Sequence, residues 1–346
     1  MHSLIIASLR KSAGKTNLIV GLGRALERRL GYLKPFGDRL LYRKKRLWDH
    51  DAALIENVFK LETSPEDMSI GFDHSKLRFM YNEESTRAKL AEMAAEVGAG
   101  RDLLFLEAGR EIAYGASVHL DPLSLARHTG APLVFVLSGD EGALLDDATF
   151  LRRRLDLAGA AVRGLVLNRL ADVEDFRATH LAAVEALGLP VLGLLPDLPE
   201  LNRLTLGFLA ERLFAKVIAG EEGLQRDVRQ IFVGAMSTDA ALRNPLFGKP
   251  GKLVVTSGDR SDMILAAIDG GSAGIVLTNN ILPPANLISH AGEKGVPLLL
   301  VSIDTYETAK QIDAIEPLLT PGDEAKIDLL ASTVRERVDL RALLGE

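Results

Sequence analysis

The sequence contains no cysteine among its 346 residues, which excludes a disulfide framework, a thiolate metal site and a cysteine nucleophile within it. Aromatic residues make up 5%, too few to favour a surface that stacks single-stranded nucleic acid, and the net charge of -6 opposes nucleic-acid binding by the whole surface. No apolar run is long enough to span a bilayer, and we expect no secretory signal, because the N-terminal residues show no secretory apolar region. We therefore expect a cytoplasmic, soluble protein.

Short apolar runs alternate with helical patterns along the first two thirds of the chain. The runs 102–106, 133–137 and 164–167 lack a two-residue period, which is typical of strands buried on both faces of a parallel sheet. The alternation predicts a doubly wound, mostly parallel α/β domain over residues 1–222, with its ligand at the carboxyl ends of the strands.

A second α/β series follows a stretch rich in glycine and charge at 219–225. Its length is that of one small domain, which we place at residues 223–330. Residues 331–346 are expected to form a terminal helix and tail. A length of 346 residues agrees with more than one domain.

The segment Ser8–Thr16 lies between the first strand and the first helical pattern, which is where a phosphate-binding loop belongs. Lys15 would contact the β- and γ-phosphates of ATP, the Thr16 hydroxyl would hold Mg²⁺, and Gly14 would allow close approach of the backbone. Leu9 stands where the standard pattern has a glycine. The alternative is an ordinary polar turn that happens to contain Gly-Lys-Thr.

Further candidates follow later strands. The expected nucleotide contacts are Ser12, Ala13, Gly14, Lys15, Thr16, Asn17, Asn168 and Pro196. Asn168 could read a base edge or cap the next turn. Pro196 ends another predicted strand near the same rim.

Three charged residues complete the predicted site. Lys34 follows the second strand and either points into the loop crevice or lies on the surface before a proline turn. The segment 49–51, with acids at Asp49 and Asp51, opens a helical pattern, where a carboxylate either caps the helix or binds Mg²⁺. Glu107 ends a strand and precedes Ala-Gly, much like a Walker B acid; the alternative is a solvated loop acid. The basic run Arg43–Arg46 is interpreted as a solvated face.

These features in this order resemble the dethiobiotin synthetase-like branch of P-loop proteins, which includes cobyrinate amidases and partition ATPases. The resemblance covers roughly residues 1–220. Residues 225–330 resemble the DRTGG domain through Gly258–Asp262 and the run 274–278. Together the two parts resemble the N-terminal, non-catalytic part of long bacterial phosphotransacetylases, so we do not expect a complete phosphotransacetylase.

The resemblance implies ATP and Mg²⁺ as cofactors, Asp51 and Glu107 as Mg²⁺ carboxylates beside Thr16, and Asn168 as the adenine reader. It also implies that Lys34 helps to hold a reacting carboxylate or phosphate, and that the protein is a homodimer. Ser8 stands where that family has its first loop glycine, which argues against the diaminopelargonate reaction itself.

Three functions follow from these predictions. The first is a regulatory ATP-binding protein whose second domain binds a small-molecule ligand or mediates assembly. The second is an ATP-dependent carboxylate ligase or cyclase that works through an acyl phosphate, with Lys15 and Lys34 as catalytic groups. The third is a partition-like ATPase, which would need a basic face or an amphipathic terminal helix for DNA or membrane. The acids that accompany Arg335, Arg337 and Arg341 in the terminal helix oppose the third.

Overall fold

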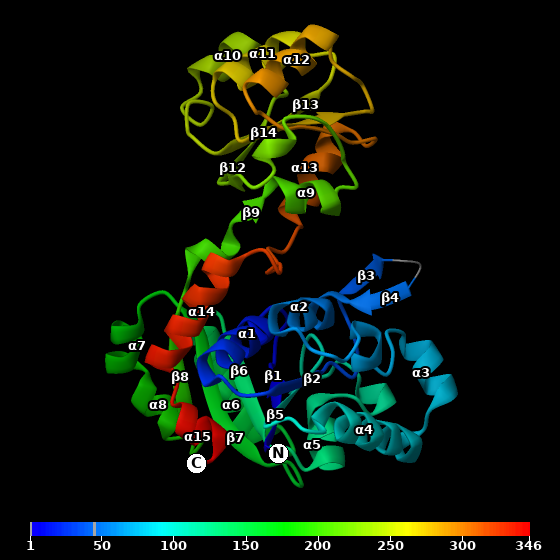
Figure 1. Cartoon of the computed structure of the whole chain (residues 1–346). Helices are drawn as coiled ribbons and strands as arrows, with labels where there is room; N and C mark the ends of the chain where they lie inside the picture. The colour runs from blue at the N-terminus through cyan, green and yellow to red at the C-terminus, as the bar shows by residue number, and fades with distance from the viewer. Residues whose placement is uncertain (1, 44–45) are drawn as a thin grey trace. The chain divides into compact units, whose positions relative to one another are not determined.

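The computed structural model of the protein describes residues 2–43 and 46–346. These residues form two compact units, one made of residues 1–198 and 319–346 and the other of residues 199–318. Each unit contains its own α/β sheet (Figure 1). Of the helices in the described ranges, none has both the length and the apolar character that crossing a membrane requires.

The first unit is built on a six-stranded sheet in the order β2-β5-β1-β6-β7-β8, and every pairing in it is parallel. This confirms the predicted doubly wound sheet. Its strands are β1 (His2–Ala7), β2 (Leu30–Leu33), β5 (Leu103–Glu107), β6 (Leu133–Ser138), β7 (Val162–Leu170) and β8 (Val191–Pro196). Most residues of the central strands are apolar and buried because helices cover both faces of the sheet.

The helices of this unit are α1 (Lys15–Leu26), α2 (His50–Phe59), α3 (His74–Met80), α4 (Glu83–Gly98), α5 (Pro122–Thr129), α6 (Glu141–Arg154), α7 (Val173–Thr179), α8 (Leu181–Glu185), α14 (Glu324–Arg337) and α15 (Leu340–Leu344). A hairpin of β3 (Leu40–Arg43) and β4 (Arg46–Asp49) leads into α2. Two residues of the predicted basic face, 44 and 45, lie outside the described residues, and Arg46 forms an ion pair with Glu66.

The second unit is built on a five-stranded sheet in the order β10-β15-β14-β13-β12, of which β10 alone is antiparallel to its neighbour among the described strands. Its strands are β10 (Lys216–Ala219), β12 (Gln230–Val233), β13 (Lys252–Ser257), β14 (Gly274–Thr278) and β15 (Leu298–Leu300). Its helices are α9 (Leu206–Arg212), α10 (Thr238–Arg243), α11 (Ser261–Asp269), α12 (Ala285–Glu293) and α13 (Thr305–Asp313). A short pair of β9 (Leu204–Thr205) and β11 (Asp227–Val228) adjoins α9.

The boundaries between the two units, at residues 198/199 and 318/319, differ from those expected at residues 222 and 330. Residues 204–219 contribute α9 and β10 to the second unit, where Leu206 and Leu209 share a core with Leu253 and Val255. Residues 324–330 belong to a helix that packs on the first unit. Sequence periodicity alone does not reveal which core a helix joins, because the helical pattern is the same in either case.

The terminal segment is an integral part of the first unit. Helix α14 lies beside α1 (Figure 1), and a Cβ on Gly21 of α1 would lie 2.7 Å from Val334 Cγ2 and 3.0 Å from the Leu330 carbonyl oxygen. Val338 forms an antiparallel bridge with Gly193, and the Asp339 N–H donates to the Leu192 carbonyl over 2.7 Å. The segment therefore covers the free edge of β8, as edge strands require.

This packing predicts that Gly21→Ala destabilises the protein by about 1–3 kcal/mol, because the added methyl group pushes α14 away from α1. Helix propensity alone predicts the opposite sign, a gain of up to about 1 kcal/mol. Gly142→Ala, in the exposed first turn of α6, is the matched control and should be neutral or stabilising. Urea unfolding of both variants measures the difference, and a stabilising Gly21→Ala would contradict the packing of α14 on α1.

Candidate functional site

The loop between β1 and α1 is the centre of the candidate site. It ends at Gly14, whose φ of +97° lies in the left-handed region that favours glycine, and Ser12 has a φ of +56°. The Asn168 Nδ2 donates to the Ala13 carbonyl oxygen over 2.9 Å, and a Cβ on Gly14 would lie 2.3 Å from that Nδ2. Gly14 is therefore required both by its conformation and by the close approach of Asn168.

The Lys15 ammonium is folded back beneath this loop. Its Nζ donates to the Ser8 Oγ over 3.0 Å and lies 3.4 Å from the Arg110 carbonyl oxygen, which accepts from it. Burial lowers the pKa of Lys15, and the negative charge of Glu107 opposes that shift. The first turn of α1 thus places a buried cation next to the backbone N–H groups of a helix start, which have no acceptor within the helix, and this is an environment for an anion.

Glu107 ends β5 with both carboxylate oxygens hydrogen-bonded. The Thr16 hydroxyl donates to Oε1 and the Tyr32 hydroxyl donates to Oε2, each over 2.8 Å. Burial, aided by the charge of Asp51, raises the pKa of Glu107 to about 7, and burial also raises the pKa of Tyr32 well above its ordinary value, so the phenol stays protonated. Thr16 and Glu107 together form a set of hard oxygens that fits Mg²⁺.

A buried acidic cluster surrounds Lys34, which follows β2. The carboxylates of Asp38, Asp49 and Asp51 lie within 4.8 Å of one another. Lys34 Nζ lies 2.5 Å from Asp51 Oδ2 and 3.4 Å from Asp49 Oδ1, and it also forms a close ion pair with Asp38. The Lys34 side chain is 2% exposed. The lysine ammonium therefore occupies the position that a cation would take among these three carboxylates.

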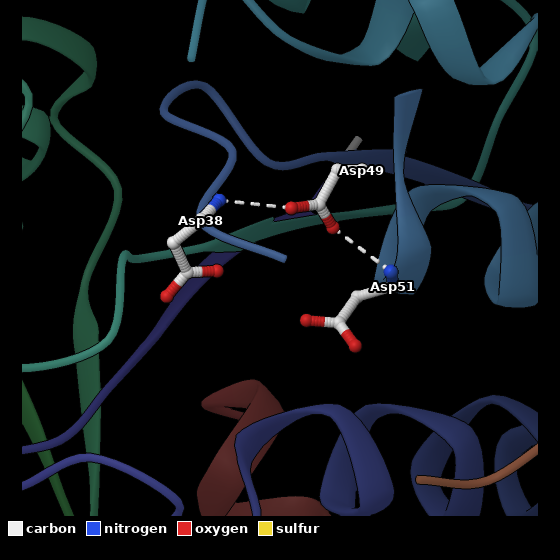
Figure 2. Close-up of side chains that lie close together, drawn as sticks. All are labelled: Asp38, Asp49 and Asp51. Atoms are coloured by element: carbon white, nitrogen blue, oxygen red, sulfur yellow. Dashed lines mark hydrogen bonds between the residues drawn. The ribbon is translucent and has the colours of Figure 1, made fainter. Parts of the chain in front are cut away.

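Asp49 organises the cluster through the backbone. Figure 2 shows its carboxylate accepting from the N–H of Asp38 over 2.9 Å and from the N–H of Asp51 over 2.8 Å. It is the N-cap of α2, so the helix-capping role that we left open for the acids at 49–51 belongs to Asp49. Asp51, in the first turn of α2, turns instead towards Lys34 and Arg39.

The charges of this cluster depend on one another. Burial opposes the charged form of Lys34, but the carboxylates of Asp51, Asp49, Glu107 and Asp38 raise the pKa of its ammonium well above the ordinary value. Burial likewise opposes ionisation of Asp51, yet Lys34 and then Arg39 and His50 hold the pKa of that carboxyl well below its usual range. The buried Lys34 and Asp51 thus stabilise each other as ions, whereas burial raises the pKa of Asp49 despite the nearby lysine.

The structure brings most of the predicted site residues together. Thr16 bonds directly to Glu107, and Lys15 bonds to Ser8 of the same loop. Lys34 pairs with Asp51, and Asn168 contacts the loop at Ala13. Asn17 follows Thr16 in the first turn of α1. Pro196 ends β8, where it is in register with Leu170 of the strand that carries Asn168.

Four residues of the site were not predicted: Tyr32, Asp38, Arg39 and Arg110. Tyr32 lies two residues before Lys34, so a strand places both side chains on one face. A phenol in an otherwise apolar strand was the available signal. Arg110 donates to the Asp38 carbonyl oxygen over 3.2 Å and lies over the Tyr114 ring at 5.3 Å, contacts that only the fold creates.

Arg10 tethers the loop to α6. Its Nε and a terminal nitrogen lie 2.8 Å from the two carboxylate oxygens of Asp147, which is a bidentate pair. The hydrogen bond and charge of Asp147 raise the pKa of Arg10. The Arg10 side chain thus anchors the loop to α6.

In the second unit, the segment Gly258–Asp262 connects β13 to α11. Arg260 donates to the carbonyl oxygens of Met236 over 2.8 Å and of Gly234 over 3.3 Å. Hydrogen bonds from Thr238 and from the N–H groups of Met263 and Asp262 lower the pKa of the Asp262 carboxyl. Asp262 therefore places a negative charge in the first turn of α11, which disfavours an anion there.

Replacing Glu107 is predicted to stabilise the metal-free protein at high pH. The folded carboxyl keeps its proton to about pH 7, whereas an unfolded one loses it near 4.5, so folding stability falls as pH rises between these values. Glu107→Gln removes this loss, which is at most about 3 kcal/mol. Urea unfolding in EDTA should show that the free energy of unfolding of E107Q rises relative to that of the native protein from pH 5 to pH 8. A difference that does not depend on pH would contradict the raised pKa.

Replacing Lys34 is predicted to destabilise the folded protein, most strongly at high pH. Lys34→Met removes the buried ammonium that three carboxylates share and should cost about 3–5 kcal/mol. The loss should be larger at pH 8 than at pH 5, because protonation relieves the repulsion. Thermal unfolding measures it, with Lys76→Met on the exposed face of α3 as the control. A loss no larger than that of the control would show that the cluster is not ionised.

Comparison with known proteins identifies both units. The AAA domain family matches residues 2–205, and the DRTGG domain family matches residues 208–315. The phosphate acetyltransferase of Pseudomonas putida is 25% identical over 363 residues, covering 98% of this chain and 51% of that protein. That of Deinococcus radiodurans is 28% identical over 369 residues, covering 98% and 50%. The chain thus spans about half the length of the curated relatives it matches.

Similarity to solved structures is weaker. The CBS and DRTGG domains of the regulatory region of Clostridium perfringens pyrophosphatase, complexed with diadenosine tetraphosphate, are 17% identical with a TM-score of 0.28, over 32% of this chain and 46% of that one. A GTPase from Pyrococcus abyssi is 15% identical with a TM-score of 0.30, over 54% and 77%. Scores this low support no argument about fold or ligand.

The two family matches, with the relatives that cover nearly the whole chain, confirm the resemblance drawn from the sequence. The chain belongs to the AAA domain family of P-loop proteins and carries a DRTGG domain after its P-loop domain, a combination that matches the N-terminal part of long phosphotransacetylases.

Proposed function

We propose that this protein binds ATP and Mg²⁺ at the P-loop and acts as a regulatory or sensory protein, with the DRTGG domain binding a ligand or mediating assembly. The observation that carries this proposal is the contrast between the two lysines of the site. Lys15 is hydrogen-bonded to neutral partners, whereas Lys34 is paired with three carboxylates.

The environment of Lys15 supports a phosphate site. An incoming phosphate can replace the Ser8 hydroxyl and the Arg110 carbonyl as partners of its ammonium, since both are weak neutral acceptors compared with a phosphate oxygen. The backbone around Ser12, Ala13, Gly14 and Asn17 would supply N–H groups at the start of α1. The side-chain oxygen of Asn168 would accept from the exocyclic amine of adenine, with Pro196 at the same rim.

The oxygen ligands support a divalent cation beside that phosphate. Thr16 and Glu107 are already in contact at 2.8 Å, and Asp51 is close enough for its charge to raise the pKa of Glu107. Bound Mg²⁺ would neutralise the β- and γ-phosphates. The residues contribute the rest: Thr16 and Glu107 as ligands, Asp51 as a further carboxylate, and Lys15 as the fixed cation.

The environment of Lys34 favours regulation over ligation. In the resembled ligases, the lysine at this position helps to hold the reacting carboxylate or phosphate. Here an anionic substrate would have to displace aspartates from a side chain that is 2% exposed, and breaking such a buried pair costs several kcal/mol. We therefore propose that Lys34 stabilises the site and that nucleotide turnover is slow.

An ATP-dependent carboxylate ligase is the second candidate function. Lys34 lies directly after β2, and it is close enough to Glu107 for that carboxylate to raise the pKa of its ammonium. A ligase would show phosphate release that a carboxylate substrate stimulates strongly.

The proposal also includes a homodimer and a cytoplasmic location, where ATP and Mg²⁺ are supplied. Any role in acetyl transfer by the longer relatives belongs to this proposal as well.

Calorimetric titration with ATP and Mg²⁺ tests the proposal directly. We expect saturable binding that Lys15→Ala reduces at least about tenfold, because a charge-assisted hydrogen bond is lost. Lys11→Ala, which removes an exposed lysine from the same loop, is the matched control and should bind nearly as the native protein does.

Phosphate release distinguishes the two candidate functions. We expect negligible turnover with ATP and Mg²⁺, and no more than a small increase when a panel of amino and carboxylic acids is added. Robust stimulation by one of them would replace the regulatory proposal with the ligase. Absence of ATP binding by the native protein would reject both.

A further inference from the structure

The Tyr32 hydroxyl is a buried polar group to which the proposed function assigns no role. Tyr32 lies on β2 opposite Phe105 of β5 and is 0% exposed. Its ring could be replaced by phenylalanine without loss of packing, whereas its hydroxyl costs free energy to bury unless it is hydrogen-bonded. That bond is made to Glu107 Oε2 over 2.8 Å.

The two bonds of Glu107 differ in what a metal ion would do to them. The Thr16 hydroxyl, which donates to Oε1, must direct an oxygen lone pair at the cation when it becomes a ligand, and this releases Oε1 for the same cation. The Tyr32 bond to Oε2 is compatible with both situations. It fixes the rotation of the carboxylate, so that Oε1 stays on the side of Thr16 and the first turn of α1.

We infer that Tyr32 is a positioning residue, which holds Glu107 in the orientation that binds a divalent cation next to the phosphate loop. The inference rests on the proposed nucleotide and metal site and deepens it. Carboxylate ligands of metals are themselves held by hydrogen bonds, and loss of such a bond typically weakens metal binding while the ligand set stays the same. A long side chain such as Glu107 needs this restraint because it has three rotatable bonds.

Tyr32→Phe tests the inference with Mn²⁺ as the probe ion. We expect the affinity of the protein–ATP complex for Mn²⁺, measured by electron paramagnetic resonance of the free ion, to fall about 10- to 100-fold. ATP affinity in EDTA should stay within about twofold of the native value, which also shows that the loop is folded. A thermal unfolding curve of the same variant checks the packing of β2.

Two control variants make the result specific. Tyr114→Phe removes the hydroxyl of another tyrosine near the site, one whose ring stacks on Phe36 at 4.7 Å, and should leave Mn²⁺ affinity unchanged. Glu107→Gln removes the carboxylate itself and should abolish the high-affinity Mn²⁺ site.

The outcomes separate the inference from the function on which it rests. Native Mn²⁺ affinity in Tyr32→Phe, together with loss in Glu107→Gln, overturns the role of Tyr32 and leaves the metal site in place. Native Mn²⁺ affinity in Glu107→Gln, or no binding by the native protein, overturns the metal site and the inference with it. An equal fall of metal-free ATP affinity and Mn²⁺ affinity in Tyr32→Phe would show a general packing role and would also overturn the inference.

Discussion

Several carboxylates and two lysines are buried beneath one loop, and their charges must be balanced inside the protein. Lys34 supplies a positive charge at the centre of three of these carboxylates, because Asp38, Asp49 and Asp51 surround its ammonium. Glu107 accepts hydrogen bonds from two hydroxyl groups instead, and burial, followed by the charge of Asp51, raises the pKa of its carboxyl to about 7. A cluster arranged in this way holds a fixed cation at Lys34 and leaves one carboxylate that gains from a second, exchangeable cation.

The same balance constrains the function. Moving the Lys34 ammonium from its aspartates to a substrate would leave buried carboxylates without this cation. The loss costs free energy in a medium of low dielectric constant. Moving Lys15 from Ser8 to a phosphate exchanges a neutral acceptor for a charged one and is favourable. This difference supports the proposed binding of a nucleotide with its metal at Lys15 and opposes binding of a second anion at Lys34.

The phosphate loop is connected to the C-terminal segment through the packing of α1 on α14. Helix α1 begins at the loop, and α14 packs on it where Gly21 leaves room. The DRTGG unit lies in the sequence between β8 and α14, so the P-loop unit is completed only after that domain has been made. Gly193 has the same role on β8, where the backbone of Val338 closes the edge of the sheet.

The sequence by itself determined the parallel sheet, the loop between β1 and α1, and the carboxylate at the end of β5, because each is encoded by neighbouring residues: apolar runs buried on two faces, and polar residues where a strand ends. It also placed Lys34 directly after β2. Only the tertiary structure decided what Lys34 contacts, since Asp38, Asp49 and Asp51 reach it through a hairpin and a helix start. It likewise decided that Tyr32 faces Glu107 and that residues 324–344 pack on the first unit, because contacts between distant segments depend on how the whole chain packs and not on local pattern.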